Sequence, residues 1–152
     1  MNLKLEVIAI PVSDIDRAKK FYQEACGFRL DADFDIEGYS KLLGFKPPFP
    51  PDFRVVQLTP PGSSCSIHIG TSTAKPGSAQ NMYLVTDDIE ATRAELVRRG
   101  VEVGEPYHLS PSGVTPGVQP QHQSYGSYAA FKDPDGNSWL IQEIRQRLPG
   151  RE

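Results

Sequence analysis

The feature that most constrains this chain is a strand-and-helix unit that the sequence contains twice. The first copy runs from Val7 to Gly27 and the second from Asn81 to Gly100. In each copy an apolar run predicts a strand, aspartates with free side-chain oxygens predict a helix N-terminus, and a glycine predicts the helix end. A unit of this kind cannot cover its apolar face alone, so we expect two related modules that pair.

The spacing between the copies supports the repeat. The predicted capping residues are Ser13 and Asp14 in the first copy and Asp87 and Asp88 in the second, and Asp14 and Asp88 are 74 residues apart. Gly27 and Gly100, the predicted helix ends, are only 73 residues apart. The first helical segment is therefore expected to be one residue longer than the second.

The remaining apolar and alternating segments complete each copy as a βαβββ unit. Residues 28–34, 53–59 and 64–69 are the further predicted strands of the first module, and residues 102–108, 127–132 and 138–144 those of the second. The predicted organisation is one module over residues 3–73, a linker over 74–79, a second module over 80–146 and a frayed tail over 147–152. The fold class is therefore expected to be α+β.

Two long segments interrupt the modules at corresponding places, residues 37–52 and residues 110–124. The first carries four prolines and three aromatic residues, which predicts a semi-rigid flap with one short helical turn at 39–43. Such loops are often functional, and two at equivalent positions would flank one cavity as lids. A packed surface loop is the alternative for the first segment.

Composition excludes several classes of function. The net charge is −3 with a pI near 5.6, and no basic cluster predicts a nucleic-acid surface. No apolar run predicts a membrane segment or a secretory signal, so we expect a cytoplasmic protein. Cys26 and Cys65 have neither metal-site nor redox-motif spacing and are expected to be unpaired thiols.

Strand alternation divides the side chains between two faces. The faces expected to meet the helices carry Ile8, Ile10, Val12, Cys65, Ile67, Ile69, Met82, Leu84, Trp139 and Ile141. The opposite faces carry Val7, Ala9, Ser66, His68, Gly70, Asn81, Tyr83, Ser138, Leu140 and Gln142. The second set mixes small, apolar and hydrogen-bonding side chains, which is typical of a face that closes over a ligand.

Three segments carry a specific resemblance: IPVSDIDRAKKFYQEACGFRL, TDDIEATRAELVRRGVEV and FKDPDGNSWLIQE. They resemble the glyoxalase, bleomycin-resistance and extradiol-dioxygenase superfamily, also called the vicinal oxygen chelate superfamily. The resemblance implies two βαβββ modules that form an incomplete, cupped mixed barrel around a central cleft, within a homodimer. In metal-dependent members it also implies a His or Glu ligand from the first and the last strand of each module.

The ligand positions carry over to Val7, Ser66, Asn81 and Leu140. Valine and leucine have no donor atom, serine is a poor ligand and an asparagine carbonyl is weak for transition metals. We therefore expect no metal and no cofactor at these positions. A displaced metal site, with His68 joined by His108 or His122, remains an alternative.

The sequence hypothesis is a metal-free protein that binds a small, partly apolar organic molecule. The expected ligand-binding residues are Val7, Ser66, His68, Asn81, Tyr83, Leu140 and Gln142. The alternative is a glyoxalase-, isomerase- or dioxygenase-type enzyme, either with the displaced metal site or with His68 as a metal-free catalytic general acid or base. The ordinary pKa of a histidine suits proton transfer near neutrality. Trp139 is expected in the core, and the Asp133 and Asp135 carboxylates are expected to stabilise a turn.

Overall fold

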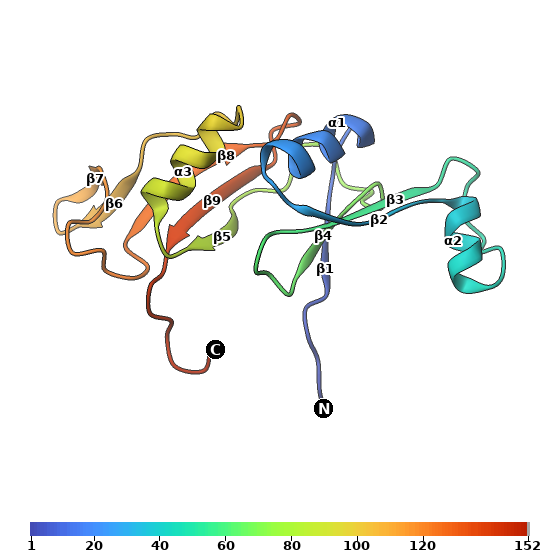
Figure 1. Cartoon of the computed structure of the whole chain (residues 1–152), viewed down its shortest axis with the longest axis horizontal. Coiled ribbons are helices and arrows are strands. Elements are labelled where there is room, and N and C mark those ends of the chain that lie inside the picture. Colours follow the sequence, from blue (N-terminus) through green and yellow to red (C-terminus); the bar gives the residue numbers. More distant parts are fainter. Residues whose placement is uncertain (152) are drawn as a thin grey trace. The chain divides into compact units, whose positions relative to one another are not determined.

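The computed structural model describes residues 1–151, which divide into two compact units, Met1–Ser78 and a second that begins at Ala79. Each unit contains one predicted βαβββ module, so the α+β fold class and the repeat are confirmed (Figure 1). The cleft that the two modules are predicted to share stays a prediction.

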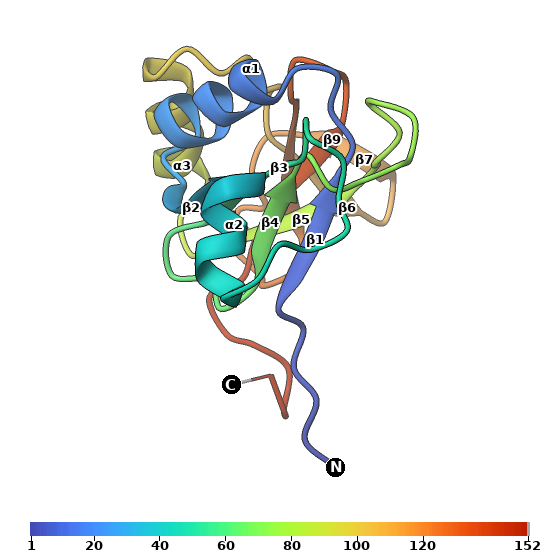
Figure 2. The same cartoon turned by 90° about the vertical axis from the view of Figure 1, so that its right-hand side faces the viewer.

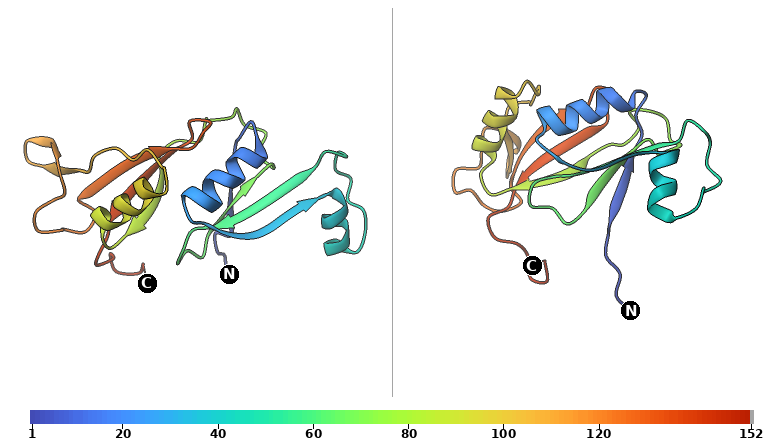
Figure 3. Two further views of the ribbon diagram at one scale, coloured as in Figure 1. Left: turned by 45° about the horizontal axis from the view of Figure 1, so that its top comes forward. Right: turned by 45° about the vertical axis from the view of Figure 1, so that its right-hand side comes forward.

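The first module is a four-stranded mixed sheet in the order β1-β4-β3-β2. Its strands are β1 (Val7–Ile10), β2 (Arg29–Asp35), β3 (Arg54–Thr59) and β4 (Ser66–Ile69). Strand β1 runs parallel to β4, and the other pairs are antiparallel. Helix α1 (Ile15–Lys20) covers one face of this sheet (Figure 3), and the buried side chains between them include Ile10, Ala18, Val56, Leu58 and Ile69.

The extra residue of the first helical segment is accommodated by a π-helical turn. Helix α1 continues into η1 (Phe21–Ala25), where the Cys26 N–H donates to the Phe21 carbonyl at 2.9 Å, five residues back. The Phe28 N–H then bonds Tyr22 O, whereas at the equivalent point of the second module the bond spans one residue less, from Val101 N to Leu96 O. A π turn absorbs one inserted residue without unwinding the rest of the helix.

The predicted flap over residues 37–52 contains more helix than the single turn expected at 39–43. Helix α2 (Ile36–Leu43) begins at Asp35, whose side chain accepts from Gly38 N at 2.8 Å, and ends at Gly44 with a φ of 80°. A capping aspartate at one end and a left-handed glycine at the other define two full turns. Figure 2 shows α2 beside the strands of the first module.

The second module is a five-stranded mixed sheet in the order β5-β9-β8-β6-β7. Its strands are β5 (Met82–Thr86), β6 (Tyr107–Ser110), β7 (Gly113–Pro116), β8 (Ser127–Lys132) and β9 (Ser138–Glu143). Helix α3 (Ile89–Arg98) begins at Asp88, whose side chain accepts from Ala91 N at 3.0 Å, as the sequence predicts. Ile89 and Leu96 are buried in the core, whereas the neighbouring Val97 is 45% exposed.

Two predicted boundaries in the second module are wrong. The strand expected over residues 102–108 begins only at Tyr107. Pro106 has no N–H to donate to a neighbouring strand, and among residues 102–106 only Gly104 donates its backbone N–H to β8, at Ala130 O. The long segment over residues 110–124 contains a strand, β7, which pairs with β6 across a tight turn. Of the predicted tail, residue 152 lies outside the described residues, while Leu148 N donates to Tyr125 OH at 2.8 Å.

Candidate functional site

The face of the first sheet that is not covered by helix α1 carries the side chains that strand alternation assigns to it. Ser66 pairs with Val7 and His68 with Ala9, while the intervening Ile67 and Ile69 are buried on the opposite face. Ile8 shares the face of Ile67 through its register but is 43% exposed, so the helix-facing set is not uniformly buried. Val7, Ser66 and His68, three of the predicted site residues, therefore share one face of one sheet.

A pocket of about 350 Å³ lies within this first module, and His68 is part of its wall. The other lining residues come from β2, α2, the loop after α2, β3 and the end of β4: Ala32, Phe34, Tyr39, Leu42, Phe49, Phe53, Val55, Gln57 and Thr71. We call this site the aromatic pocket. It is mainly apolar, with a small number of hydrogen-bonding groups, which is the usual composition of a small-molecule site.

Four rings form one side of the aromatic pocket. Phe49 and Phe53 are stacked with centroids 4.6 Å apart, and Tyr39 lies 6.0 Å from Phe49 and 5.5 Å from Phe53. Phe34 adds a fourth ring 6.5 Å from Tyr39. These spacings and small interplanar angles are those of interacting aromatic pairs, so the predicted flap is an ordered wall rather than a free loop. Phe45, in the same segment, is 63% exposed.

A chain of polar side chains crosses the sheet from the pocket to its edge. His68 Nε2 lies 2.9 Å from Gln57 Oε1, and Gln57 Nε2 donates to Ser66 Oγ at 3.4 Å. Ser66 Oγ and Thr59 Oγ1 are 2.7 Å apart, and Thr59 Oγ1 donates to an Asp31 carboxylate oxygen. We call these five residues the polar chain.

A β-bulge presents Asp31 to the polar chain. The register of β2 against β3 shifts between Leu30 and Ala32, so Asp31 is the extra residue of the bulge. A hydrogen bond from Arg29 at 2.6 Å is the main reason that the pKa of Asp31 is lowered, and the Thr59 bond adds to it. Asp31 is thus an ionised carboxylate at neutral pH.

Burial lowers the pKa of His68 below its usual value. The ring is therefore neutral at pH 7, since desolvation disfavours the imidazolium. A neutral imidazole has one donor and one acceptor nitrogen, and its role depends on which nitrogen carries the proton.

A group of salt bridges on the helix-facing side of the first sheet connects the strands of the pocket to α1. Asp33, next to Phe34, accepts from Arg54 Nη2 at 2.9 Å and from Lys19 Nζ at 2.8 Å. The Arg54 bond is the main reason that the pKa of Asp33 falls to about 2, and the Lys19 bond contributes. Arg54 also binds Asp16 at 2.7 Å.

The second module brings together three more predicted site residues. Tyr83 pairs with Leu140, and Gln142 follows on the same face, where its Nε2 donates to Tyr128 OH at 3.0 Å. Tyr83 is 57% exposed. Asn81, the fourth predicted residue of this module, lies before β5 with a φ of 55°, so strand alternation does not extend to it.

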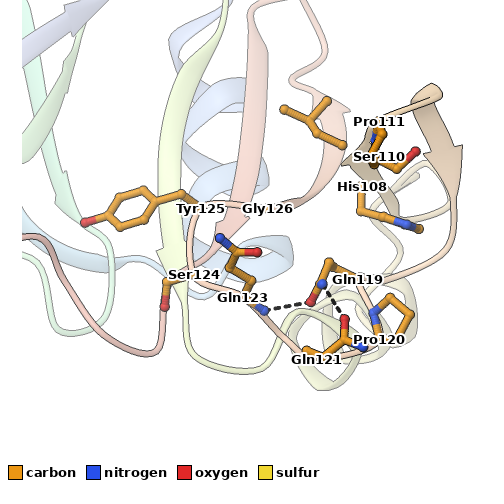
Figure 4. A pocket seen from close by; sticks show the side chains of 11 residues that line it. His108, Ser110, Pro111, Gln119, Pro120, Gln121, Gln123, Ser124, Tyr125 and Gly126 are labelled. Atoms are coloured by element: carbon orange, nitrogen blue, oxygen red, sulfur yellow. Dashed lines mark hydrogen bonds between the residues drawn. The ribbon is translucent and has the colours of Figure 1, made fainter.

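The second module also has a pocket of about 510 Å³ formed by the β6 end and residues 119–126 (Figure 4). Its walls are held by their own hydrogen bonds. Gln119 Nε2 donates to Gln121 Oε1 at 2.7 Å, and Gln119 Oε1 accepts from Gln123 N at 2.8 Å. His108 lines this pocket and its Nδ1 lies 2.7 Å from Gly117 O. Since these polar groups bond one another, the pocket walls offer few aligned groups to a ligand.

The other histidine weighed as a metal ligand pairs with a buried carboxylate. His122 Nδ1 lies 2.8 Å from Glu143 Oε1, and Glu143 Oε2 accepts from Ile89 N, at the start of α3, at 3.1 Å. Glu143 is fully buried on the helix-facing side of β9. Within residues 1–151, no three His, Cys, Asp or Glu side chains are grouped so that they could hold a metal ion.

The predicted structural roles of Asp133 in the DPDGN turn and of Trp139 are confirmed. Asp133 accepts from Asp135 N, Asn137 N and Asn137 Nδ2 at 2.8–2.9 Å and is buried. Trp139 is 4% exposed and stacks on Phe131.

Cys26 and Cys65 are free thiols, and no helix among the described residues is long and apolar enough to cross a membrane.

Sequence reasoning missed Phe34, Phe53 and Gln57 as pocket residues. Phe53, Val55 and Gln57 follow one another at two-residue spacing, as do Ala32 and Phe34, so the two-residue period of a strand could have grouped them on one face. The bulge at Asp31 has no comparable local signal.

Comparisons with known proteins agree on one family. The model of the Glyoxalase/Bleomycin resistance protein/Dioxygenase superfamily matches residues 4–141. A solved structure of TnmS3, an antibiotic binding protein from Streptomyces sp. CB03234, is 30% identical, covers 94% of this chain and 97% of that chain, and has a TM-score of 0.66. A glyoxalase/bleomycin resistance protein from Streptomyces sp. CB03234 is 31% identical over 92% of this chain and 100% of that chain, with a TM-score of 0.63.

A curated relative, the uncharacterized protein YetH of Bacillus subtilis (strain 168), is 26% identical over 147 residues. The match covers 94% of this chain and 100% of YetH. The similarity therefore extends over both modules.

Proposed function

This chain belongs to the glyoxalase/bleomycin resistance protein/dioxygenase superfamily, and on that premise we propose that it binds a small, partly apolar organic molecule in the aromatic pocket. The observation that carries the proposal is the pocket itself, which is lined by four aromatic rings together with Gln57 and His68. The antibiotic-binding role of the similar TnmS3 supports the same class of function.

We propose that binding does not use the metal of the family's metal-dependent members. The positions that correspond to its ligands hold Val7, Ser66, Asn81 and Leu140, two of which have no donor atom. The Ser66 hydroxyl is buried and already bonded to Thr59. These residues do not fit a divalent ion.

The test is binding of 2-naphthol, a flat molecule small enough for the pocket, measured by isothermal titration calorimetry. Phe49→Ala removes a ring that stacks on Phe53, and we expect it to weaken binding about tenfold or more, since a stacked ring contributes about 1–3 kcal/mol. Phe49 is 41% exposed, so its loss leaves the core intact. The matched control is Phe45→Ala, in the same segment but outside the pocket. Equal affinities of the two variants would contradict the proposal.

A metal-free enzyme is the second candidate, and it is favoured by the position of His68 in the pocket wall, where burial lowers the pKa of its imidazole. In that case His68→Ala would abolish turnover of any substrate, because no other His and no Asp, Glu, Lys or Cys lines the described pocket walls. Unchanged turnover in this variant would remove the candidate.

The remaining parts of the proposal concern the molecule as a whole. We propose a homodimer, as the family resemblance implies, and a cytoplasmic location, as the sequence pattern predicts. We also propose that Val7, Asn81, Tyr83, Leu140 and Gln142 contribute further contacts to the ligand. Analytical ultracentrifugation measures the oligomeric state, and a monomer at micromolar concentration would exclude the dimer.

A further inference from the structure

The aromatic pocket is built for an uncharged molecule. Among its described lining residues there is no Asp, Glu, Lys or Arg. A charged group placed between the rings would lose its hydration without gaining an opposite charge, which is costly. The hydrogen-bonding groups of the walls, such as Gln57 and His68, are neutral.

The ionised Asp31 carboxylate determines which group donates and which accepts in each hydrogen bond of the polar chain. An ionised carboxylate can only accept hydrogen bonds, so Thr59 must donate its hydroxyl proton to Asp31. Thr59 Oγ1 is then free to accept, which makes Ser66 the donor in the bond between the two hydroxyls. Ser66 Oγ in turn accepts from Gln57 Nε2.

The same order of donors and acceptors determines the tautomer of His68. Because Gln57 uses Nε2 toward Ser66, its Oε1 faces His68, and a carbonyl oxygen can only accept. His68 therefore carries its proton on Nε2 and leaves the Nδ1 lone pair as the acceptor of the ring. Within residues 1–151 the His68 ring makes no second hydrogen bond.

We propose that the aromatic pocket selects flat, uncharged aromatic molecules that carry a hydroxyl or N–H group, and that His68 Nδ1 accepts a hydrogen bond from that group. This inference rests on the proposed function, because it names the ligand class of the same pocket. Thr59 and Asp31 are positioning residues, which act on the ligand only through the tautomer of His68.

The first test compares 2-naphthol with 2-methoxynaphthalene, which has the same ring system but no donor. Calorimetry on the full chain is expected to give about fivefold tighter binding of 2-naphthol, the effect of one neutral hydrogen bond. Equal binding of the two probes would overturn the inference while leaving the proposed function standing. Failure of both probes to bind would instead count against the proposed function.

The second test breaks the polar chain outside the pocket. Thr59→Val keeps the side-chain shape but removes the hydroxyl, so His68 is no longer held in one tautomer. We expect the preference for 2-naphthol to fall to less than twofold, with the affinity for 2-methoxynaphthalene unchanged. Thr59→Ser restores a hydroxyl and is expected to restore the preference. A full preference in Thr59→Val would overturn the role of the chain.

The third test needs no variant and no ligand. Imidazole ¹⁵N chemical shifts distinguish the protonated from the unprotonated ring nitrogen, and this chain has only three histidines to assign. We expect His68 to be protonated on Nε2 in the wild-type protein at pH 7. A proton on Nδ1 would overturn the inference directly.

Discussion

Replacing Asp33 with asparagine should destabilise the first module in a pH-dependent way. The Asp33 carboxylate binds both Arg54 and Lys19, and its side chain is only 24% exposed. Its pKa falls from 3.8 to about 2, which corresponds to about 2.4 kcal/mol of stabilisation of the charged form. Partial exposure to solvent screens this interaction, so we expect Asp33→Asn to lower the free energy of unfolding by about 1–2 kcal/mol at pH 7.

The sign of the pH dependence follows from the lowered pKa. A carboxylate whose pKa is lower in the folded state stabilises the fold above its unfolded pKa, here 3.8. That contribution is lost as the pH falls toward about 2. The difference between wild type and Asp33→Asn should therefore be constant from pH 7 to pH 5 and smaller at pH 3.

The assay is urea unfolding followed by far-UV circular dichroism, which reports on the strands and helices of both modules. Asp16→Asn is the matched control. Asp16 also binds Arg54, at 2.7 Å, but its side chain is 81% exposed, so its loss should cost less than about 0.5 kcal/mol. Equal effects of the two variants, or an Asp33→Asn effect that does not change between pH 7 and pH 3, would refute the reasoning.

Three further predictions concern a buried charge, two glycines and the flap. Glu143→Ala should destabilise the protein by about 3–5 kcal/mol in urea unfolding, since a buried carboxylate that binds both His122 and the start of α3 is removed. Gly70→Ala should lower the free energy of unfolding by more than about 2 kcal/mol in the same assay, because the added Cβ would lie 2.3 Å from a backbone oxygen. Gly44→Ala is the control and should lower it by about 1 kcal/mol, because the space around Gly44 is open. Residues 37–52 should become more resistant to limited proteolysis when 2-naphthol is bound, and equal cleavage with and without it would argue against ordering by the ligand.

The local chemistry of capping and alternation could be predicted well from the sequence. Asp14 and Asp88 cap their helices as expected, because a cap needs only a side-chain oxygen within three residues of the N–H that it satisfies. Ser66 and His68 share a face for an equally local reason, the two-residue period of a strand. The one-residue difference between the helical segments was also predictable, but not that a π turn would absorb it.

The aromatic pocket depended on contacts that local patterns do not contain. Whether Phe49 and Phe53 stack on Tyr39 depends on how the proline-rich segment returns to the sheet after α2. The link from Asp31 to Thr59 joins residues 28 positions apart and exists because a bulge shifts the register of β2 by one residue.

The sequence alone thus determined the repeat, the α+β class, the helix caps and the face on which His68 lies, since each depends on neighbours within one element. Only the tertiary structure decided which rings line a pocket together with His68 and which nitrogen of the His68 ring lies next to Gln57. The physical reason is that strand pairing and bulges join distant parts of the chain, and a shift of one residue in register changes every contact across the sheet.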